Sequence, residues 1–320
     1  MKVCILGAGS YGLALALAFY KNNNDVTVWT KVESEKEEII NYRENRKALP
    51  GVSIPEKIKI TTNLNDNYEL IVIAIPINYF RSVCEEIKNS INSDTILCIA
   101  SKGIEKDTNL FPHEVLNSII ETNNIAILSG PTFAIDLAKN SPSGLVCAST
   151  SINIYKSIKN CLESNTLKIA YTNDLIGTEI CGSIKNVMAI LSGLLEGIKI
   201  TETTKALFLT EALNETSNFI ETMNGNKETS YTLAGLGDLI LTCTSKKSRN
   251  YTLGTLIATE NKSNIDNYIL NNTVEGYYTL IAINEIIKKK EISVPLVELL
   301  YKILFEGLDK KEIFNLLIKN

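Results

Sequence analysis

Short runs of apolar and β-branched residues alternate with amphipathic stretches over the first half of the chain. These runs predict strands at 2–6, 25–29, 57–60, 70–75, 95–100, 125–129, 144–149 and 167–171. Helical patterns lie between them, at 10–22, 32–44, 78–90, 112–121 and 151–163. Several runs are apolar at nearly every position, which is typical of strands covered on both faces. The alternation predicts a doubly wound, mainly parallel sheet.

The strand pattern stops after Tyr171, and longer helical patterns follow it. We expect helices at 173–200, 201–223, 249–260, 274–290 and 294–306. The sequence therefore predicts an α/β, Rossmann-type domain over 1–172 and an all-α domain over 173–320. A chain of 320 residues with 45% hydrophobic composition can bury two such cores.

The composition limits the classes of function. A net charge of −4 argues against a general nucleic-acid surface, which needs a basic excess. The seven cysteines form no C-x-x-C pair and mostly stand in apolar runs, so we expect buried free thiols in a reducing cytoplasm. Glycines interrupt the apolar N-terminus, unlike a signal peptide, and no run reaches the ~20 apolar residues of a membrane span. We therefore expect a cytoplasmic protein.

His113 is the single histidine, and it follows Pro112 at an expected helix start. We expect it at the surface and not in catalysis. Its isolation argues against Ser-His-Asp and Cys-His mechanisms, and we expect no metal site. Any acid–base chemistry must then use another residue type.

The segment GAGSYG, residues 7–12, follows the first expected strand and opens the first expected helix. Gly7 allows a tight turn, Gly9 lets a pyrophosphate approach the backbone, and Gly12 lets helix and strand pack closely. The helix N-terminus adds N–H donors and a positive dipole for the phosphates. An ordinary glycine turn is the alternative, but the strand–turn–helix context favours dinucleotide binding.

The end of the second expected strand bears on the choice of dinucleotide. It reads Trp29, Thr30 and Lys31, without the acidic residue that binds a ribose 2′-hydroxyl. A cation at Lys31 suits a 2′-phosphate.

Two further segments place polar groups at the carboxyl ends of strands, where ligands bind in open parallel sheets. Lys102 lies in ASKGIE, although an ordinary surface lysine in a turn is an equal alternative. In SGPTFA, residues 129–134, a glycine and a proline expose the backbone and Thr132.

The segment AGLGDLILTCTSKKSRN, residues 234–250, has no simple structural explanation. Asp238 lies between glycine turns and an apolar stretch, and Ser248, Arg249 and Asn250 precede a helical pattern from Tyr251. A helix N-terminus with an arginine fork and an amide is a ready phosphate site. Helix capping explains Ser248 equally well, and both roles are compatible.

Lys185 stands in a run from Leu175 to Ile200 that is otherwise mostly apolar or small. A buried, unpaired lysine is costly and tends to lose its proton. Either the side chain reaches solvent along its stem, or the protein uses it.

Taken together, these segments resemble those of the bacterial-type NAD(P)-dependent glycerol-3-phosphate dehydrogenases, and the resemblance extends over nearly the whole chain. The motifs that carry the resemblance stand in family order: GAGSYG, NRKALPGVSIPEKI, ASKGIE, SGPTFA, GSIKNV, GLGDLILTCTSKKSRN and TVEGYYT. Related hydroxyacid dehydrogenases share the fold and the first motif but not this set.

The resemblance implies hydride transfer between NAD(P)H and C2 of dihydroxyacetone phosphate, giving glycerol 3-phosphate for phospholipid precursors. It implies that Lys185 is the catalytic acid–base, flanked by Lys102 and Asp238, with a pKa that burial and the second lysine lower toward neutrality. Further substrate contacts are implied at Gly130, Thr132, Asn186, Thr242, Ser248, Arg249 and Asn250. Besides the three glycines of GAGSYG, coenzyme contacts are implied at Ser10, Tyr11, Lys31, Lys102, Ala134, Arg249, Thr273 and Glu275.

Two departures from the family pattern concern the coenzyme. Lys31 and Val32 stand where many relatives carry His-Arg, and Thr273 replaces a usual aliphatic residue. We expect use of both NADPH and NADH, with a modest preference for NADPH.

Two other functions stay open: a dinucleotide-sensing regulator without turnover, and a 6-phosphogluconate-dehydrogenase-like reductase acting on a carboxylate. The expected partner is a small molecule, and the sequence is compatible with a homodimer.

Overall fold

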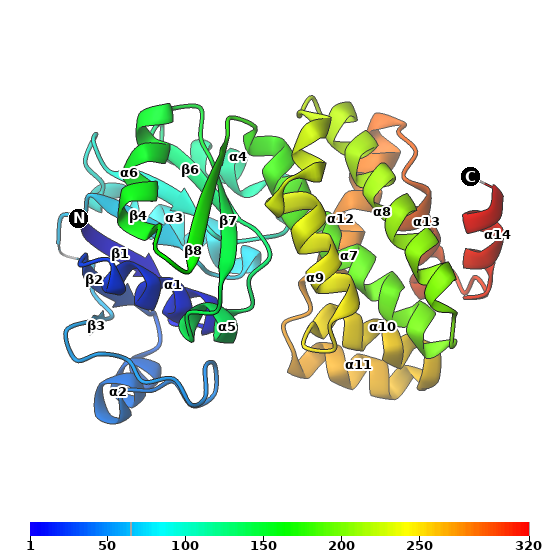
Figure 1. Cartoon of the computed structure of the whole chain (residues 1–320), viewed down its shortest axis with the longest axis horizontal. Helices are drawn as coiled ribbons and strands as arrows, with labels where there is room; N and C mark the ends of the chain where they lie inside the picture. The colour runs from blue at the N-terminus through cyan, green and yellow to red at the C-terminus, as the bar shows by residue number, and fades with distance from the viewer. Residues whose placement is uncertain (65, 320) are drawn as a thin grey trace. The chain divides into compact units, whose positions relative to one another are not determined.

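The chain folds into two compact units in the computed structural model, which describes residues 1–64 and 66–319 (Figure 1). The first unit contains Met1–Ser101 and Pro112–Leu175, and the second contains Lys102–Phe111 and Ile176–Asn320. Lys102 therefore belongs to the same unit as the C-terminal helices.

The first unit is built on an eight-stranded sheet. Its strands are β1 (Lys2–Leu6), β2 (Asp25–Trp29), β3 (Lys59–Thr61), β4 (Leu70–Ile73), β5 (Ile96–Ile99), β6 (Ile125–Ser129), β7 (Ser143–Ala148) and β8 (Leu167–Thr172). Their order is β3-β2-β1-β4-β5-β6-β7-β8, and every neighbouring pair is parallel except β6 and β7. This confirms the doubly wound, mainly parallel sheet. The third strand lies at 59–61 rather than 57–60.

The helices of this unit are α1 (Ser10–Lys21), α2 (Glu33–Tyr42), α3 (Ile77–Ile87), α4 (Pro112–Asn117), α5 (Ala134–Ala138) and α6 (Ile152–Leu162), with a short 3₁₀ turn η1 (Lys88–Ser90). α1 contacts α5 and α6, whereas α3 contacts α4. The sheet grows in opposite directions from β1 and β4, so right-handed crossovers put α1 and α3 on opposite faces. All residues of β4, β5 and β6 are buried as a result. α5 was not expected, because five residues are too few to show a helical period.

The order of the strands reverses between β1 and β4, and this is where ligands bind in open α/β sheets. Residues that follow β1, β2, β5 and β6 come out at the same carboxyl edge, since these strands are parallel. GAGSYG and SGPTFA therefore lie at one edge of the sheet.

The second unit is helical. Its elements are α7 (Leu175–Gly197), α8 (Glu202–Thr222), the 3₁₀ turn η2 (Lys227–Tyr231), the π-helical turn η3 (Leu233–Gly237), α9 (Asp238–Thr244), α10 (Arg249–Thr259), α11 (Lys262–Asn271), α12 (Glu275–Lys290), α13 (Pro295–Phe305) and α14 (Glu312–Lys319). α9, α11 and α14 were not expected. α11 has no fully buried residue, although Ile265, Tyr268 and Ile269 stand at helical spacing and are half-buried.

α7 is the core helix of this unit, and every residue from Gly177 to Leu195 is buried. By length and composition alone it could also cross a membrane, and no other helix among the described residues passes that test. Since 89% of the tested window is buried inside the protein, packing between helices accounts for its apolar character. The seven cysteines are buried free thiols, as expected.

Candidate active site

The turn after β1 needs glycine for two different reasons. Gly7 has φ of +113°, and a Cβ there would lie 2.6 Å from the carbonyl oxygen of Ala74. A Cβ at Gly12 would lie 2.0 Å from the oxygen of Gly7, so the first turn of α1 presses directly on the loop. A Cβ at Gly9 would meet nothing within 4 Å. Protein packing does not require glycine at position 9, and the open space beside the N-terminus of α1 fits a dinucleotide pyrophosphate.

The segment after β6 lies against this turn. The Tyr11 hydroxyl and the Thr132 hydroxyl are 3.3 Å apart. Gly130 has φ of +151°, and a Cβ there would lie 2.9 Å from the oxygen of Gly144. Ser10 opens α1 and Ala134 opens α5, so the structure brings the expected ligand contacts of the first unit to one edge.

Lys31 lies at the end of β2 and forms an exposed ion pair with Glu86 of α3, with 3.2 Å between Nζ and Oε2. Glu33, the first acidic residue after Lys31, is engaged elsewhere. It pairs with Lys36 at 2.6 Å and accepts a hydrogen bond from Thr62 at 3.0 Å. Lys31 is thus paired with a carboxylate of α3.

Asn45 is hydrogen-bonded to the glycine turn that follows β1, and the sequence analysis assigned it no role. Its Nδ2 donates to the carbonyl oxygen of Ala8 at 3.1 Å and to Glu35 at 3.0 Å, and Glu35 accepts from Thr30 at 2.5 Å. Asn45 is buried and begins the motif NRKALPGVSIPEKI. The motif therefore ties the end of β2 to the glycine turn, which the motif alone did not indicate.

The centre of the second unit is a carboxylate between two ammonium groups. Asp238 Oδ2 lies 3.0 Å from Lys102 Nζ, and Asp238 Oδ1 lies 2.5 Å from Lys185 Nζ. The Asp238 side chain is 1% exposed, and that of Lys185 is 10% exposed. Lys185 is therefore buried and paired, and its side chain does not extend freely into solvent. Sequence reasoning placed the three residues in one site but did not foresee that Asp238 joins both lysines.

Burial and charge act against each other in this cluster. Burial lowers the pKa of Lys185 from 10.5 to about 8, the charge of Asp238 opposes that shift, and the charge of Lys102 adds to it. Burial by itself would raise the pKa of Asp238, but the two ammonium groups outweigh it and hold that pKa below its usual value. Asp238 is therefore held in its ionised form, and a pKa of about 8 allows Lys185 to act as a proton donor and acceptor.

Local contacts fix the three groups. The backbone N–H of Gly103 donates to Ser183 Oγ at 3.2 Å, which attaches the Lys102 segment to α7 two residues before Lys185. η3 leads into Asp238 as a π-helical turn, a form often found at functional sites. Thr242 donates to the backbone oxygen of Asp238 at 2.6 Å, one turn along α9. The sequence analysis did not single out Ser183, although it stands within GSIKNV.

The N-terminus of α10 has the features that the sequence predicted, a capping serine followed by an arginine and an asparagine. Ser248 caps it, accepting a hydrogen bond from the N–H of Tyr251 at 3.3 Å. Arg249 is exposed, whereas Asn250 is buried. The first N–H groups of a helix have no partner within it, so this end offers donors beside the exposed guanidinium of Arg249.

α10 packs on α7 through backbone contacts at glycines. A Cβ at Gly193 would lie 1.9 Å from the oxygen of Tyr251, and a Cβ at Gly254 would lie 1.9 Å from the oxygen of Ile190. These glycines hold the Arg249 helix at close range to the Lys185 helix. Glycine within a helical pattern was the available signal for such an approach.

A hydrogen-bonded network connects Asn186, Asn250 and the first residues of α12. Asn250 Nδ2 donates to Asn186 Oδ1 at 2.9 Å, and Asn186 Nδ2 donates to Glu275 at 3.3 Å. Burial raises the pKa of Glu275, while Lys102, Arg249 and Lys185 oppose that shift. Thr273, just before α12, is exposed.

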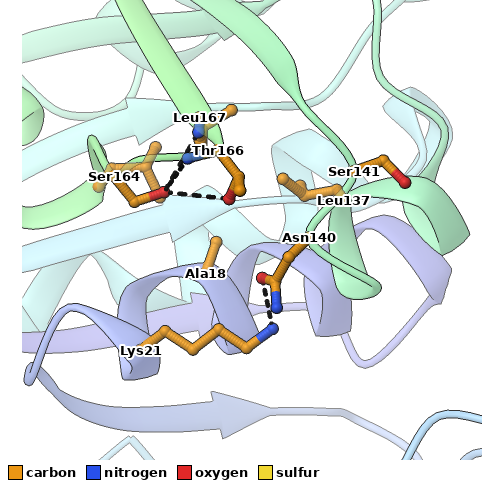
Figure 2. A pocket seen from close by; sticks show the side chains of 9 residues that line it. Ala18, Lys21, Leu137, Asn140, Ser141, Ser164, Thr166 and Leu167 are labelled. Carbon is orange, nitrogen blue, oxygen red and sulfur yellow. Dashed lines mark hydrogen bonds between the residues drawn. The ribbon is translucent and has the colours of Figure 1, made fainter.

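A small cavity in the first unit carries no comparable chemistry. It lies between the ends of α1 and α5 and the start of β8, and its volume is about 20 Å³, room for one water molecule (Figure 2). Lys21 Nζ donates to Asn140 at 2.6 Å and to the oxygen of Ala138 at 3.2 Å. The ammonium group is thus engaged by its own surroundings.

Comparisons with known proteins identify the family of the chain. The family model described as "NAD-dependent glycerol-3-phosphate dehydrogenase N-terminus" matches residues 2–155, and the corresponding C-terminus model matches residues 174–315. The glycerol-3-phosphate dehydrogenase [NAD(P)+] of Listeria monocytogenes is 35% identical over 99% of this chain and 96% of its own. That of Fusobacterium nucleatum is 33% identical over 98% and 96%.

Among solved structures, the glycerol-3-phosphate dehydrogenase of Coxiella burnetii superposes with a TM-score of 0.92 at 30% identity. The match covers 100% of this chain and 99% of that one. The two family models, the full-length relatives and the shared fold lead to one conclusion: the chain belongs to the family of NAD(P)-dependent glycerol-3-phosphate dehydrogenases, which are oxidoreductases.

Proposed function

We propose that this family member reduces dihydroxyacetone phosphate to glycerol 3-phosphate with Lys185 as the general acid. The observation that carries the assignment is the cluster of Lys185, Asp238 and Lys102, buried in a chain with one histidine. When C2 of the ketone becomes an alcohol, its oxygen must gain a proton. Lys185, with a pKa of about 8, can donate that proton and take it back in the reverse reaction.

The two partners of Lys185 have different tasks in this proposal. Lys102 is the second cation of the cluster and stabilises negative charge as it develops on the carbonyl oxygen. Asp238 neutralises one of the two positive charges, which keeps Lys185 protonated in its buried position. The nicotinamide supplies the hydride, and the protein supplies position and electrostatic field.

The N-terminus of α10 is the proposed phosphate site. The exposed guanidinium of Arg249 can bind a phosphate through two parallel hydrogen bonds, and the first N–H groups of the helix add donors. Thr132 and Gly130 in the first unit, and Thr242 and Asn186 in the second, stay proposed substrate contacts.

The coenzyme proposal is dual use with a modest preference for NADPH. Lys31 attracts a 2′-phosphate as a flexible point charge, but it lacks the fork of an arginine, and Val32 adds no polar group. Glu86 already pairs with Lys31, so a 2′-phosphate must compete with a carboxylate. An exposed ion pair contributes about 0–1 kcal/mol, so competition with Glu86 changes the affinity of Lys31 for a 2′-phosphate only slightly. We therefore expect the preference for NADPH to be small.

The regulator without turnover is the other function considered. It accounts for the glycine turn but leaves the paired lysines and Asp238 without a purpose. The other reductase would act on a substrate that carries a carboxylate in place of the phosphate. The buried thiols are consistent with a reducing cytoplasm, where we place the enzyme.

The test is a coenzyme-oxidation assay at the nicotinamide absorbance band with dihydroxyacetone phosphate as substrate. We expect saturable turnover, competition by glycerol 3-phosphate and no competition by hydroxy acids. Coenzyme binding without turnover would support the regulator. Turnover of 2-keto acids in preference to the phosphorylated ketone would support the other reductase.

A further inference from the structure

The segment that carries Lys102 is a loop of the second unit. β5 ends at Ile99 in the first unit, but residues 102–111 belong to the helical unit, and α4 begins directly after them, back in the first unit. We call residues 102–111 the Lys102 loop. Since the strand before it lies in the other unit, contacts within the helical unit determine where Lys102 lies.

The Lys102 loop is held in shape by its own backbone. The N–H of Glu105 donates to the oxygen of Leu110 at 2.9 Å, and the N–H of Asn109 donates to the oxygen of Glu105 at 3.0 Å. Both ends of the loop are buried, because Ile104 is 3% exposed and Phe111 is 1% exposed. A contact at either end therefore constrains the rest of the loop.

Two side chains of the helical unit hold this loop. Near its start, the N–H of Gly103 donates to Ser183 Oγ of α7 at 3.2 Å, and both residues are buried. Near its end, Asn109 Nδ2 donates to Glu285 Oε2 of α12 at 3.0 Å, in an exposed position where water competes. The Ser183 contact is therefore the firmer of the two.

The Ser183 contact also joins the segments of the two lysines. Gly103 follows Lys102 directly in the chain, and Ser183 precedes Lys185 by two positions on α7. A single hydrogen bond thus connects the backbone beside one ammonium group to the helix that carries the other.

We infer that Ser183 is a positioning residue, which holds the Lys102 loop on α7 and thereby keeps the Lys102 ammonium group on Asp238. Asn109 and Glu285 form a second attachment at the far end of the loop. The catalytic roles of the two lysines rest on the proposed function, whereas the attachment of the loop does not.

Release of the loop has a definite effect on the pH dependence. Three charged groups act on the Lys185 ammonium: Asp238 and Glu275 raise its pKa, and Lys102 lowers it. Release of the loop withdraws only Lys102, so the pKa of Lys185 rises. Ketone reduction requires the protonated amine, so the alkaline limb of kcat/KM moves to higher pH. Loss of Asp238 has the opposite sign.

Ser183→Ala removes the acceptor for the N–H of Gly103 and is the first test. We expect kcat for reduction of dihydroxyacetone phosphate to fall about 3–10-fold, the range that corresponds to one hydrogen bond. The alkaline limb should move up by about 0.5 pH unit, because a nearby like charge is withdrawn for part of the time. Amide hydrogen exchange in residues 102–111, followed by mass spectrometry, should become faster.

A double-mutant cycle shows whether Ser183 acts through Lys102. In Lys102→Met the loop carries no ammonium group, so adding Ser183→Ala should change neither kcat nor the alkaline limb any further. An equal fall in kcat in both backgrounds would show that Ser183 acts on Lys185 or on the fold directly, which overturns the inference.

The matched control is Ser149→Ala in the first unit. Ser149 is buried, and its Oγ accepts from the N–H of Ser151 at 3.2 Å, the same kind of contact at the same length. Ser149 follows β7, which runs antiparallel to β6, so it lies at the edge of the sheet opposite the glycine turn. Its loss should lower Tm but leave kcat and the alkaline limb unchanged. A similar shift of the limb in this control would overturn the inference.

Glu285 provides a second pair of variants at the surface. Glu285→Ala removes the far attachment, whereas Glu285→Gln keeps an acceptor for Asn109. Added to Ser183→Ala, Glu285→Ala should lower kcat by more than the product of the two single effects, because one attachment still holds the loop in each single variant. If Ser183→Ala does not fold, faster exchange of residues 102–111 in Glu285→Ala than in Glu285→Gln supports the attachment, and equal exchange overturns it.

The remaining outcomes also decide the inference. An unchanged kcat in folded Ser183→Ala would overturn it, as would an alkaline limb that stays in place or moves to lower pH. If the wild type does not reduce the ketone, the proposed function fails. Hydrogen exchange in Ser183→Ala still tests the attachment in that case: faster exchange of the loop supports it, and unchanged exchange overturns it.

Discussion

Asp238→Asn should move the pH dependence of ketone reduction to lower pH. Reduction requires protonated Lys185, whose pKa is about 8, so kcat/KM of the wild type should fall as the pH rises through that value. Oxidation of glycerol 3-phosphate requires the neutral amine, and its rate should rise over the same interval. The charge of Asp238 raises the pKa of Lys185, and its removal leaves burial and Lys102 to lower it unopposed.

The size of the shift follows from the ion pair. Two unit charges about 4 Å apart interact by about 4 kcal/mol at an effective dielectric constant of about 20. The Lys185–Asp238 contact is closer, at 2.5 Å, but the asparagine retains a hydrogen bond. Since one pKa unit corresponds to about 1.36 kcal/mol, we expect the alkaline limb to move down by about 1–3 pH units.

The assay measures initial rates of NADPH oxidation across this limb at saturating coenzyme. The second ionisation of the substrate phosphate lies near pH 6, so it affects the acidic side and not the alkaline limb. Asp266→Asn, an exposed residue of α11, removes the same charge from the same unit and is the matched control. Loss of one partner from a buried pair also destabilises a protein, so circular dichroism must show that the variant is folded. An alkaline limb that stays in place, or moves to higher pH, would refute the role of Asp238 in holding the charge of Lys185.

The remaining predictions concern the acid, the phosphate site and the coenzyme. Lys185→Ala should lower kcat about 10²–10⁴-fold, because a positioned general acid is lost, while coenzyme binding measured by fluorescence stays intact; turnover within a few-fold of the wild type would contradict the assignment. Arg249→Ala should mainly raise KM for dihydroxyacetone phosphate and reduce discrimination against unphosphorylated dihydroxyacetone. If that discrimination survives, the phosphate binds elsewhere. Lys31→Asp should shift the ratio of kcat/KM values toward NADH, because a carboxylate repels a 2′-phosphate and accepts from a ribose hydroxyl. Glu86→Gln should shift it toward NADPH by a few-fold at most, and unchanged ratios in both variants would show that Lys31 does not face the ribose.

Several elements could be predicted because their signals are local. β1, β2 and β6 have the predicted bounds, because short runs rich in apolar and β-branched residues indicate strands. Gly7 and Gly12 follow from the strand–turn–helix order, and Ser248 from capping chemistry that spans three residues. α5 and α9 were missed, because a helix of one or two turns shows no clear period. α11 was missed although Ile265, Tyr268 and Ile269 stand at helical spacing, because polar residues surround them and none of its residues is fully buried.

The sequence by itself determined which chemical groups are present: a dinucleotide turn, a lysine in an apolar helix, and an arginine at a helix start. These are properties of neighbouring residues, and neighbouring residues determine local conformation. Only the tertiary structure decided how the groups meet. Lys102 and Asp238 are 136 positions apart, and Asn186 and Glu275 are 89 apart, so no local pattern records their contact. The pKa of Lys185 and the direction of the hydrogen bond between Asn250 and Asn186 depend on burial and on partners from other helices, because charge and hydrogen-bond polarity act through space.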